Sequence, residues 1–412
     1  MRKVAAASLA LSLGLVVAAC GDSGTGDGSS VTMWMYPVIA DQEASRTFWT
    51  EVEQEFEKAN SDIDLTIELQ PWDGRQETIS TALASGTGFD IVLLSPDQIP
   101  QHAEQGSLLP VDDLVADEVD AFLPNAVQAL TVDGELYGAP IYHTVVTPMY
   151  NKALFAEAGI TEPPATWDDL VAAAGPLAAK GIPVLDYPGD PEETLNLTFY
   201  PLLWQAGGQV FSDDGKSVAF DEPAGVKALQ LLADLNEAGG LPKDAPTTKN
   251  TVEGRAFTNG KAAVLQGADL ATAQQLITAL GEDTAVPIPP LTDDAQVTFG
   301  IPGALSVSHA TENTDAVATV LKYLSSADTA TKLAEASGFF PARTDVQMPA
   351  QGPGVEVFAG ALEFANPGDA HPAARQVMSI LAPQVQAVLL GKKTPEQALA
   401  DAAAEADPVL AR

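Results

Sequence analysis

The chain has little basic charge, few aromatic residues and a single cysteine. Lys and Arg number 20 against 56 Asp and Glu, which gives a formal net charge of -36 at pH 7. A surface this acidic repels phosphate backbones and anionic lipid headgroups, so nucleic-acid binding is excluded as a main function. Cys20 is the one cysteine in 412 residues, so no disulfide forms within the chain. Aromatic residues make up only 6%, so any gathering of Trp and Tyr is informative.

Long apolar runs are also missing beyond the first twenty residues. Arg2 and Lys3 precede an uncharged apolar run that ends at Val17, shorter than the ~20 residues of a membrane span. Residues 1–19 are therefore predicted to be a signal peptide. Residues 20–30 contain nothing that packs and are predicted to be a flexible tether. The remainder is predicted to lie outside the cytoplasmic membrane.

The residues around Cys20 resemble a bacterial lipobox, with Val17 in place of the usual Leu. The resemblance implies that Cys20 carries a diacylglycerol and anchors the mature protein to the cell membrane. Ordinary secretion with an incidental cysteine is the alternative.

After the tether, strand and helix patterns alternate. Residues 31–35 and 63–69 read as strands, residues 89–94 as a buried central strand, and residues 41–59 and 75–85 as the helices between them. This β-α-β-α-β order predicts an α/β lobe, in which ligands bind beyond the carboxyl ends of the strands. Those ends carry Tyr36, Trp72, Asp73 and Asp97, so two aromatic rings and two carboxylates are predicted to share one edge.

At this point the chain resembles the sugar-type extracellular solute-binding proteins of bacterial ABC importers, the maltodextrin-binding class. The resemblance rests on short motifs in the family's order: FEKAN at 56–60, ALASGTGFDI at 82–91, GSLLPVDDL at 106–114, YGAP at 137–140 with MYNK at 149–152, PPATWDDL at 163–170, FTNGKAAV at 257–264, SGFFPAR at 337–343 and LGKKTPE at 390–396.

The resemblance implies the two-lobed periplasmic-binding-protein fold, each lobe an α/β sheet flanked by helices. It places lobe I at residues 31–140 plus 266–324 and lobe II at residues 141–265 plus 325–412. Three interlobe crossings are expected, near 140–147, 262–265 and 323–327. The lobes would close on a solute and dock on ABC permease subunits; the protein would be a monomer without cofactor or metal, and not an enzyme.

Sugars need aromatic faces for stacking and carboxylates that accept from hydroxyls. Trp34, Tyr36, Trp72, Asp97 and Tyr142 have suitable types near the expected cleft. Helix capping is the alternative role for Asp97, wedging against a helix for Trp72, and core packing for Trp34.

Three basic residues are further candidates. His143 lies beside the first crossing, His371 precedes a predicted helix, and Arg343 closes the SGFFPAR motif. Capping or surface positions are the alternatives for the two histidines, and an ion pair is the alternative for Arg343. Tyr200 and Trp204 read as core residues of a helix.

The chain departs from the family pattern at two positions. Asp269 stands where Trp is frequent, and Ala304 where an aromatic residue is frequent; Phe299 is a candidate to supply the missing face. These changes favour a small sugar, a polyol or an amine-bearing solute over a long maltodextrin. A secreted glycan-acting hydrolase and a surface-adhesion lipoprotein remain alternatives, although serine-nucleophile, zinc and phosphate-loop motifs are absent.

Overall fold

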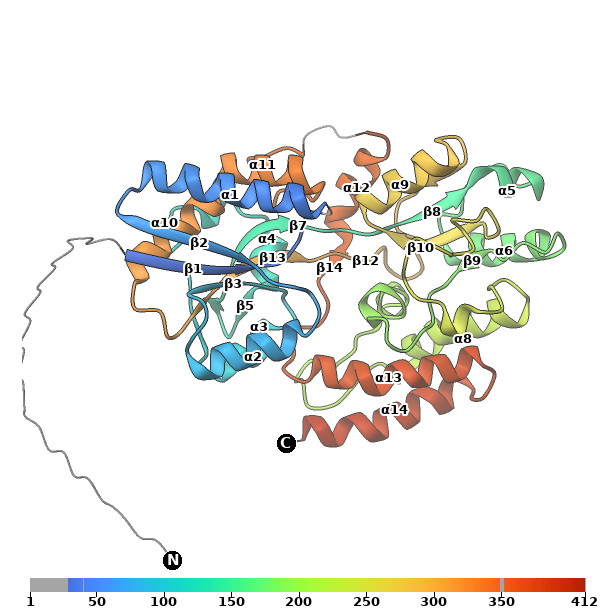
Figure 1. The fold of residues 1–412 in the computed structure, drawn as a ribbon. Helices are drawn as coiled ribbons and strands as arrows, with labels where there is room; N and C mark the ends of the chain where they lie inside the picture. Colours follow the sequence, from blue (N-terminus) through green and yellow to red (C-terminus); the bar gives the residue numbers. More distant parts are fainter. Residues whose placement is uncertain (1–28, 40, 349–351, 412) are drawn as a thin grey trace, which may run out of the picture.

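The structure, a computed structural model, describes residues 29–39, 41–348 and 352–411. Two lobes lie side by side in this part of the chain, each built around its own β-sheet (Figure 1). The predicted two-lobed α/β architecture is confirmed. The predicted signal peptide and Cys20 lie outside the described residues. The strand β1 begins at Ser29, so it includes the last two residues of the segment predicted as a tether.

The first lobe is built on a six-stranded sheet of order β2-β1-β3-β13-β4, with β7 also paired to β13. The strand β1 is parallel to β2 and β3, whereas β13 is antiparallel to its neighbours. Its elements are β1 (Ser29–Met35), α1 (Gln42–Ala59), β2 (Ile63–Leu69), α2 (Arg75–Ser85), β3 (Ile91–Leu94), α3 (Ile99–Glu104), β4 (Leu108–Leu109), η1 (Val119–Ala121), α4 (Pro124–Ala129), β5 (Thr131–Val132), β6 (Glu135–Leu136), β7 (Ala139–His143), β13 (Pro302–Ser308), α10 (Thr314–Leu324) and α11 (Ala327–Ser337).

Local sequence signals set the boundaries of the first helices. The Asp41 carboxylate accepts from the Ala44 amide at 2.8 Å and begins α1, which ends at Asn60 as predicted. Gly86 ends α2 in the left-handed conformation at φ 64°, which an L side chain adopts only with strain. On α1, Trp49, Val52 and Phe56 face the core of the lobe.

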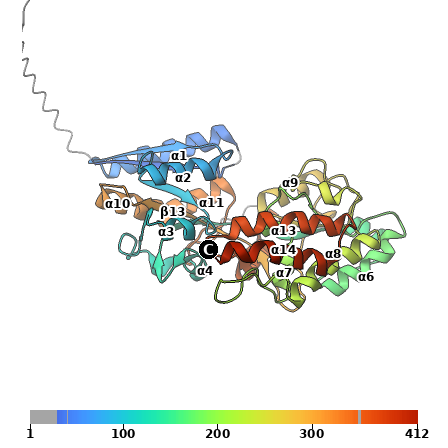
Figure 2. The same cartoon turned by 90° about the horizontal axis from the view of Figure 1, so that it is seen from below.

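The second lobe is built on a four-stranded sheet of order β11-β8-β10-β9, in which β8 is antiparallel to β10 and β11. Figure 2 shows α13 and α14 side by side along the underside of this lobe. Its elements are β8 (Thr147–Asn151), α5 (Lys152–Glu157), α6 (Trp167–Ala178), β9 (Leu185–Asp186), η2 (Leu195–Leu197), α7 (Tyr200–Gln205), α8 (Pro223–Glu237), η3 (Ala245–Thr247), β10 (Val264–Ala268), α9 (Leu270–Leu280), β11 (Ala285–Pro287), β12 (Thr298–Phe299), α12 (Val355–Ala361), η4 (Leu362–Phe364), β14 (Ala365–Asn366), α13 (Ala374–Leu389) and α14 (Pro395–Leu410).

The expected assignment of segments to the two lobes is wrong after the first crossing. That crossing lies at residues 144–146, but β10, α9 and β11 join the second sheet, because β8 pairs with both strands. The chain therefore returns to the first lobe near residue 301, and not at 262–265. The third crossing lies after residue 345, and not at 323–327, because α11 still packs against β7.

The first two crossings form a short hydrogen-bonded ladder between the lobes. The Thr144 amide donates to the Ile301 carbonyl at 2.8 Å, and the Val146 amide donates to the Phe299 carbonyl at 3.0 Å. On the first-lobe side, His143 and Phe340 exchange backbone hydrogen bonds. We call residues 143–146 and 299–301 the hinge.

Candidate ligand-binding cleft

The strand ends of the first lobe present an aromatic face toward solvent. Trp72 follows β2 and is 48% exposed, although its ring lies 5.0 Å from that of buried Tyr36. Its indole N–H donates to the Pro37 carbonyl at 3.2 Å. The Arg75 guanidinium lies 4.6 Å from the Tyr36 ring centroid and 5.1 Å from that of Trp72. Trp72 is thus held on one face and open on the other, which suits a stacking partner.

Asp97, at the end of β3, connects the two lobes. Its Oδ1 accepts from the Ser95 hydroxyl at 2.6 Å, and its Oδ2 accepts from Arg375 Nε at 2.5 Å. Arg375 belongs to α13 of the second lobe, so this ion pair spans the cleft. Asp97 does not cap α3, whose N-cap is Gln98.

A hollow lies between the lobes at this ion pair. The second lobe contributes most of its lining, and Asp97 comes from the first: Asp97, Asn196, Tyr200, Val210, Phe211, Asp369, Ala374, Arg375 and Met378. The Tyr200 hydroxyl and Asp369 Oδ2 are both buried and have no hydrogen-bond partner among the described residues. Burial raises the pKa of Asp369 to about 6. Both atoms therefore have unused hydrogen-bonding capacity.

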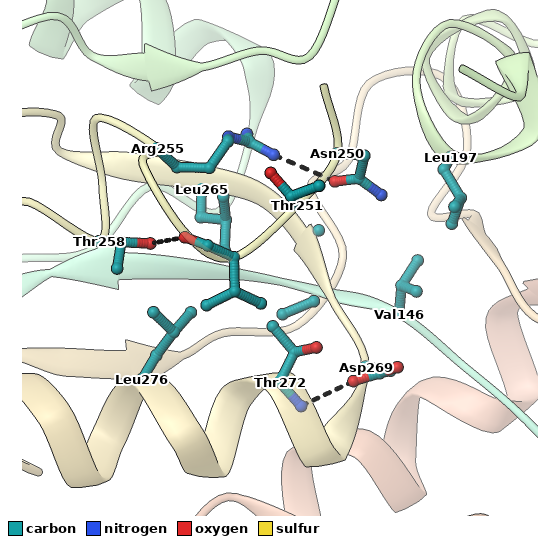
Figure 3. A pocket seen from close by; sticks show the side chains of 13 residues that line it. Val146, Leu197, Asn250, Thr251, Arg255, Thr258, Leu265, Asp269, Thr272 and Leu276 are labelled. Carbon is teal, nitrogen blue, oxygen red and sulfur yellow. Dashed lines mark hydrogen bonds between the residues drawn. The ribbon is translucent and has the colours of Figure 1, made fainter. Parts of the chain in front are cut away.

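A second hollow of about 160 Å³ lies beside the hinge (Figure 3). Val146 of the hinge, Leu197 of η2 and Asp269 are among its lining residues. A cavity of ~150 Å³ holds a benzene molecule, so this hollow has room for one six-membered ring. Asn196 of η2 lines the interlobe hollow, and its neighbour Leu197 lines this one.

The polar groups of the second hollow are mostly engaged. Asp269 caps α9, and its Oδ1 accepts from the Thr272 amide at 2.7 Å. Arg255 is buried and donates to Asp186 and to Asn250. Asp269, which stands where the family pattern often has Trp, thus lines a cavity, but one of its oxygens is already bound to the start of α9.

Tyr142 and His143 lie at the end of β7. Tyr142 is 7% exposed, and burial raises the pKa of its hydroxyl to about 12, while the nearby Arg75 opposes this rise. His143 is 2% exposed, and its Nδ1–H donates to the Thr144 carbonyl at 2.8 Å. Burial lowers the pKa of His143 to about 4. His143 is therefore a neutral hinge residue, and the expectation that it faces the cleft is wrong.

Two other candidates have structural roles. Trp34 packs against the Phe89 ring at 4.8 Å and against Gly88, within the first lobe. Arg343 binds Asp345 through Nε and Nη2, and Glu118 and the Ser325 carbonyl through Nη1. Arg343 therefore has no nitrogen left for a ligand, and the alternative ion-pair reading holds for it.

His371 and Phe299 pack against residues of the second lobe and do not line the interlobe hollow. The His371 ring stacks on Phe211 at 4.3 Å, its Nε2–H donates to the Gly215 carbonyl at 3.1 Å, and its Nδ1 accepts from the Ala373 amide. Phe211 lines the interlobe hollow, so His371 positions a lining residue. Phe299 lies on β12 in the hinge and packs against the second-lobe core.

Sequence reasoning missed Arg75, Arg375 and Asp369 as cleft residues. Arg75 begins α2 directly after the strand-end segment with Trp72, and Arg375 and Asp369 flank His371. Arg75 and Arg375 are among only 20 basic residues of the chain. All three missed residues stand close in the sequence to predicted site residues, and this closeness was the available signal. Tyr200 was assigned to the core, and the structure adds that its hydroxyl reaches the hollow.

The described residues contain neither a metal-binding cluster nor a membrane-spanning helix. Across residues 29–39, 41–348 and 352–411, no three His, Cys, Asp or Glu side chains are grouped as a metal site would require. No helix in the same residues combines the length and apolar character needed to span a bilayer.

The fold and the cleft between hinged lobes agree with the sequence comparisons. Residues 40–331 match the family described as bacterial extracellular solute-binding proteins, which is most of the chain. The protein belongs to this family.

Named relatives and solved structures extend over nearly the whole chain. A Brucella abortus protein, whose binding role is itself only inferred, is 27% identical over 88% of this chain and 90% of its own. The diacetylchitobiose binding protein of Streptomyces coelicolor is 25% identical over 84% of this chain and 83% of its own. A Thermotoga lettingae ABC transporter solute-binding protein, solved with α-D-tagatose, is 25% identical, has a TM-score of 0.76 and covers 93% of this chain and 100% of its own.

Proposed function

We propose that this protein is the substrate-binding lipoprotein of an ABC importer and captures a small carbohydrate between its lobes. The observation that carries the proposal is the exposed Trp72 face at the strand-end edge of the first lobe, the edge that also carries Asp97, which lines a hollow between the lobes. An aromatic face with nearby carboxylate and hydroxyl groups suits a ring that is apolar on its C–H face and polar at its edge.

The relatives are named for sugars of different lengths, from a maltotriose and an arabinooligosaccharide to shorter ones. Among them are a diacetylchitobiose binding protein and a structure with bound α-D-tagatose. The hollow of about 160 Å³ next to the hinge has room for one ring. The missing aromatic positions, Asp269 and Ala304, favour such a short ligand over a long maltodextrin.

Lipid anchoring and permease docking complete the proposal. The lipobox at Cys20 supports attachment to the outer face of the cytoplasmic membrane through a diacylglycerol. Two lobes joined by three chain crossings support hinge closure, which would present the closed form of a monomer to the permease subunits.

A glycan-acting hydrolase is the rival that the cleft makes testable. Glycosidases use one protonated and one ionised carboxyl group, and Asp97 and Asp369 line the same hollow. Asp97, however, is bound to Ser95 and Arg375, and we propose that the cleft performs no chemistry. Incubating stoichiometric protein with each bound sugar and analysing it by mass spectrometry tests this, because conversion of the sugar would establish a hydrolase.

Calorimetry tests the binding proposal. A panel of mono- and disaccharides is titrated into the protein without its first 28 residues, and at least one is expected to bind. Replacing Trp72 by Ala is expected to weaken that binding by roughly 1–3 kcal/mol, since a stacking face is lost. Val171→Ala is the matched control, because Val171 is 47% exposed on α6, outside the cleft. Equal affinity of both variants would remove Trp72 from the site, and no binding by any sugar would refute the proposal.

A further inference from the structure

The two acidic side chains of the interlobe hollow differ in their partners. Asp97 binds a hydroxyl and the Arg375 guanidinium. Asp369, in the segment between β14 and α13, forms no ion pair with any described residue, and its buried Oδ2 has no hydrogen-bond partner there. The Tyr200 hydroxyl in the same hollow is also without a partner in the described part of the chain. The negative charge of Asp97 is therefore compensated by a cation, and that of Asp369 is not.

The cations of the cleft do not compensate Asp369. Arg375 is bound to Asp97 through Nε, and Arg75 lies over the Tyr36 and Trp72 rings, with Nη2 donating to the Leu93 carbonyl at 2.7 Å. Burial is the cause of the raised pKa of Asp369, and no cationic side chain opposes it. At neutral pH the interlobe hollow thus holds a desolvated carboxylate and an unpartnered hydroxyl.

A bound solute has to supply Asp369 with both a hydrogen bond and a compensating positive charge. A neutral hydroxyl group would give Asp369 a hydrogen bond but would leave its charge uncompensated. A protonated amine gives both a hydrogen bond and an opposite charge, and such charge-assisted bonds are roughly twice as strong as neutral ones. The same amine could retain its other N–H donors for Tyr200 Oη.

From this geometry we infer that the ligand is a carbohydrate with a free, protonated amino group, which binds Asp369 and Tyr200 when the lobes close. This inference rests on the proposed function, because it names a chemical class for the solute of the same cleft. A metal ion is the less favoured cation, since the described residues hold no cluster of three metal-ligating side chains. The formal net charge of -36 also attracts cationic solutes toward the surface.

Matched sugar pairs test the inference. Calorimetry at pH 7.5 compares glucosamine with glucose, galactosamine with galactose, and fully deacetylated chitobiose with cellobiose, and each amino sugar with its N-acetyl form. At least one amino sugar is expected to bind tenfold or more tightly than both its neutral partner and its N-acetyl form. The preference should disappear in Asp369→Asn. Asp113→Asn is the control, because it removes one exposed negative charge and leaves the cleft unchanged.

The outcomes separate the inference from the proposed function. If neutral or N-acetylated sugars bind as tightly as the amino sugars, or if Asp369→Asn retains the preference, the inference is overturned and the carbohydrate receptor stands. If no sugar of any kind binds, or if a simple diamine such as putrescine binds and no sugar does, the proposed function itself fails.

Discussion

Charged side chains near the third crossing and in the cleft differ in how completely their partners satisfy them. Arg343, near the third crossing, is 6% exposed and donates to two carboxylates and a carbonyl. Arg375, in the cleft, is exposed over 57% of its side chain and forms one ion pair, while Asp369 forms none with a described residue. Groups that hold the fold have complete sets of partners, and groups that meet a solute retain unused bonding capacity.

Of the substitutions considered, removal of Arg343 should lower the free energy of unfolding the most. Arg343→Ala leaves Glu118 and the Ser325 carbonyl without their partner, so we expect the free energy of unfolding to fall by about 3–4 kcal/mol. Arg375→Ala is the matched control and should lower it by less than about 1 kcal/mol. Chemical denaturation of both variants measures these losses, and equal losses would abolish the distinction between the third crossing and the cleft.

The hinge should also respond to acid through His143. The pKa of His143 is about 4 in the folded protein and 6.5 for an ordinary histidine, so the unfolded chain takes up the proton at a higher pH. The free energy of unfolding should therefore fall as the pH drops from about 6.5 toward 4, by about 2 kcal/mol at pH 5. His143→Asn retains an N–H donor and should lack this component in denaturation curves from pH 7.5 to 5. The same pH slope in both proteins would contradict the prediction.

Through Asp369 in the cleft, the free energy of unfolding should depend on pH in the opposite sense. Its pKa is about 6 in the folded protein against 3.8 for an ordinary aspartate, so its ionisation opposes folding above about pH 4 and fully above pH 6. Asp369→Asn should raise the free energy of unfolding of the ligand-free protein by about 1–2 kcal/mol at pH 7.5, a value discounted for partial exposure, and leave it unchanged at pH 4. Asp113→Asn is again the control, and destabilisation by Asp369→Asn at pH 7.5 would show that the carboxylate has a structural partner.

The smallest expected effect concerns the ion pair across the cleft. Arg375→Gln removes the partner of Asp97 and should shift the ligand-free protein toward open forms, by less than about 1 kcal/mol. Small-angle scattering should then give a larger radius of gyration, and 1 M salt should do the same to the wild type by screening the pair. Lys332→Gln, which removes two ion pairs within the first lobe, should leave the radius unchanged. Equal radii for all three proteins would show that this ion pair does not hold the lobes together.

Local signals made the first lobe predictable. Asp41, Asn60 and Gly86 bound α1 and α2 as expected, because capping and the left-handed glycine depend on a few neighbouring residues. Thr166 and Asp169 likewise form a capping box at the start of α6, another signal carried by a few neighbouring residues. The edge formed by Tyr36, Trp72 and Asp97 could be inferred from the β-α-β-α-β order alone, because parallel strands end on one side.

The assignment of later segments could not be predicted in the same way. Pairing of β8 with both β10 and β11 joins segments more than one hundred residues apart, and no local pattern states which sheet a strand enters. The roles of His143 and Arg343 were ambiguous for a related reason. The same side chain serves a buried ion pair or a ligand according to its neighbours in space, and those neighbours come from distant parts of the chain.

The paired hinge segments restrict how the two lobes move relative to each other. Hydrogen bonds from Thr144 to Ile301 and from Val146 to Phe299 tie two crossings into a narrow ribbon. Such a ribbon flexes readily perpendicular to its plane, whereas sideways bending would stretch the bonds on one margin. The two lobes should therefore rotate about one axis and reach the same closed arrangement each time. The shape of that single closed arrangement would then set which solutes the protein selects.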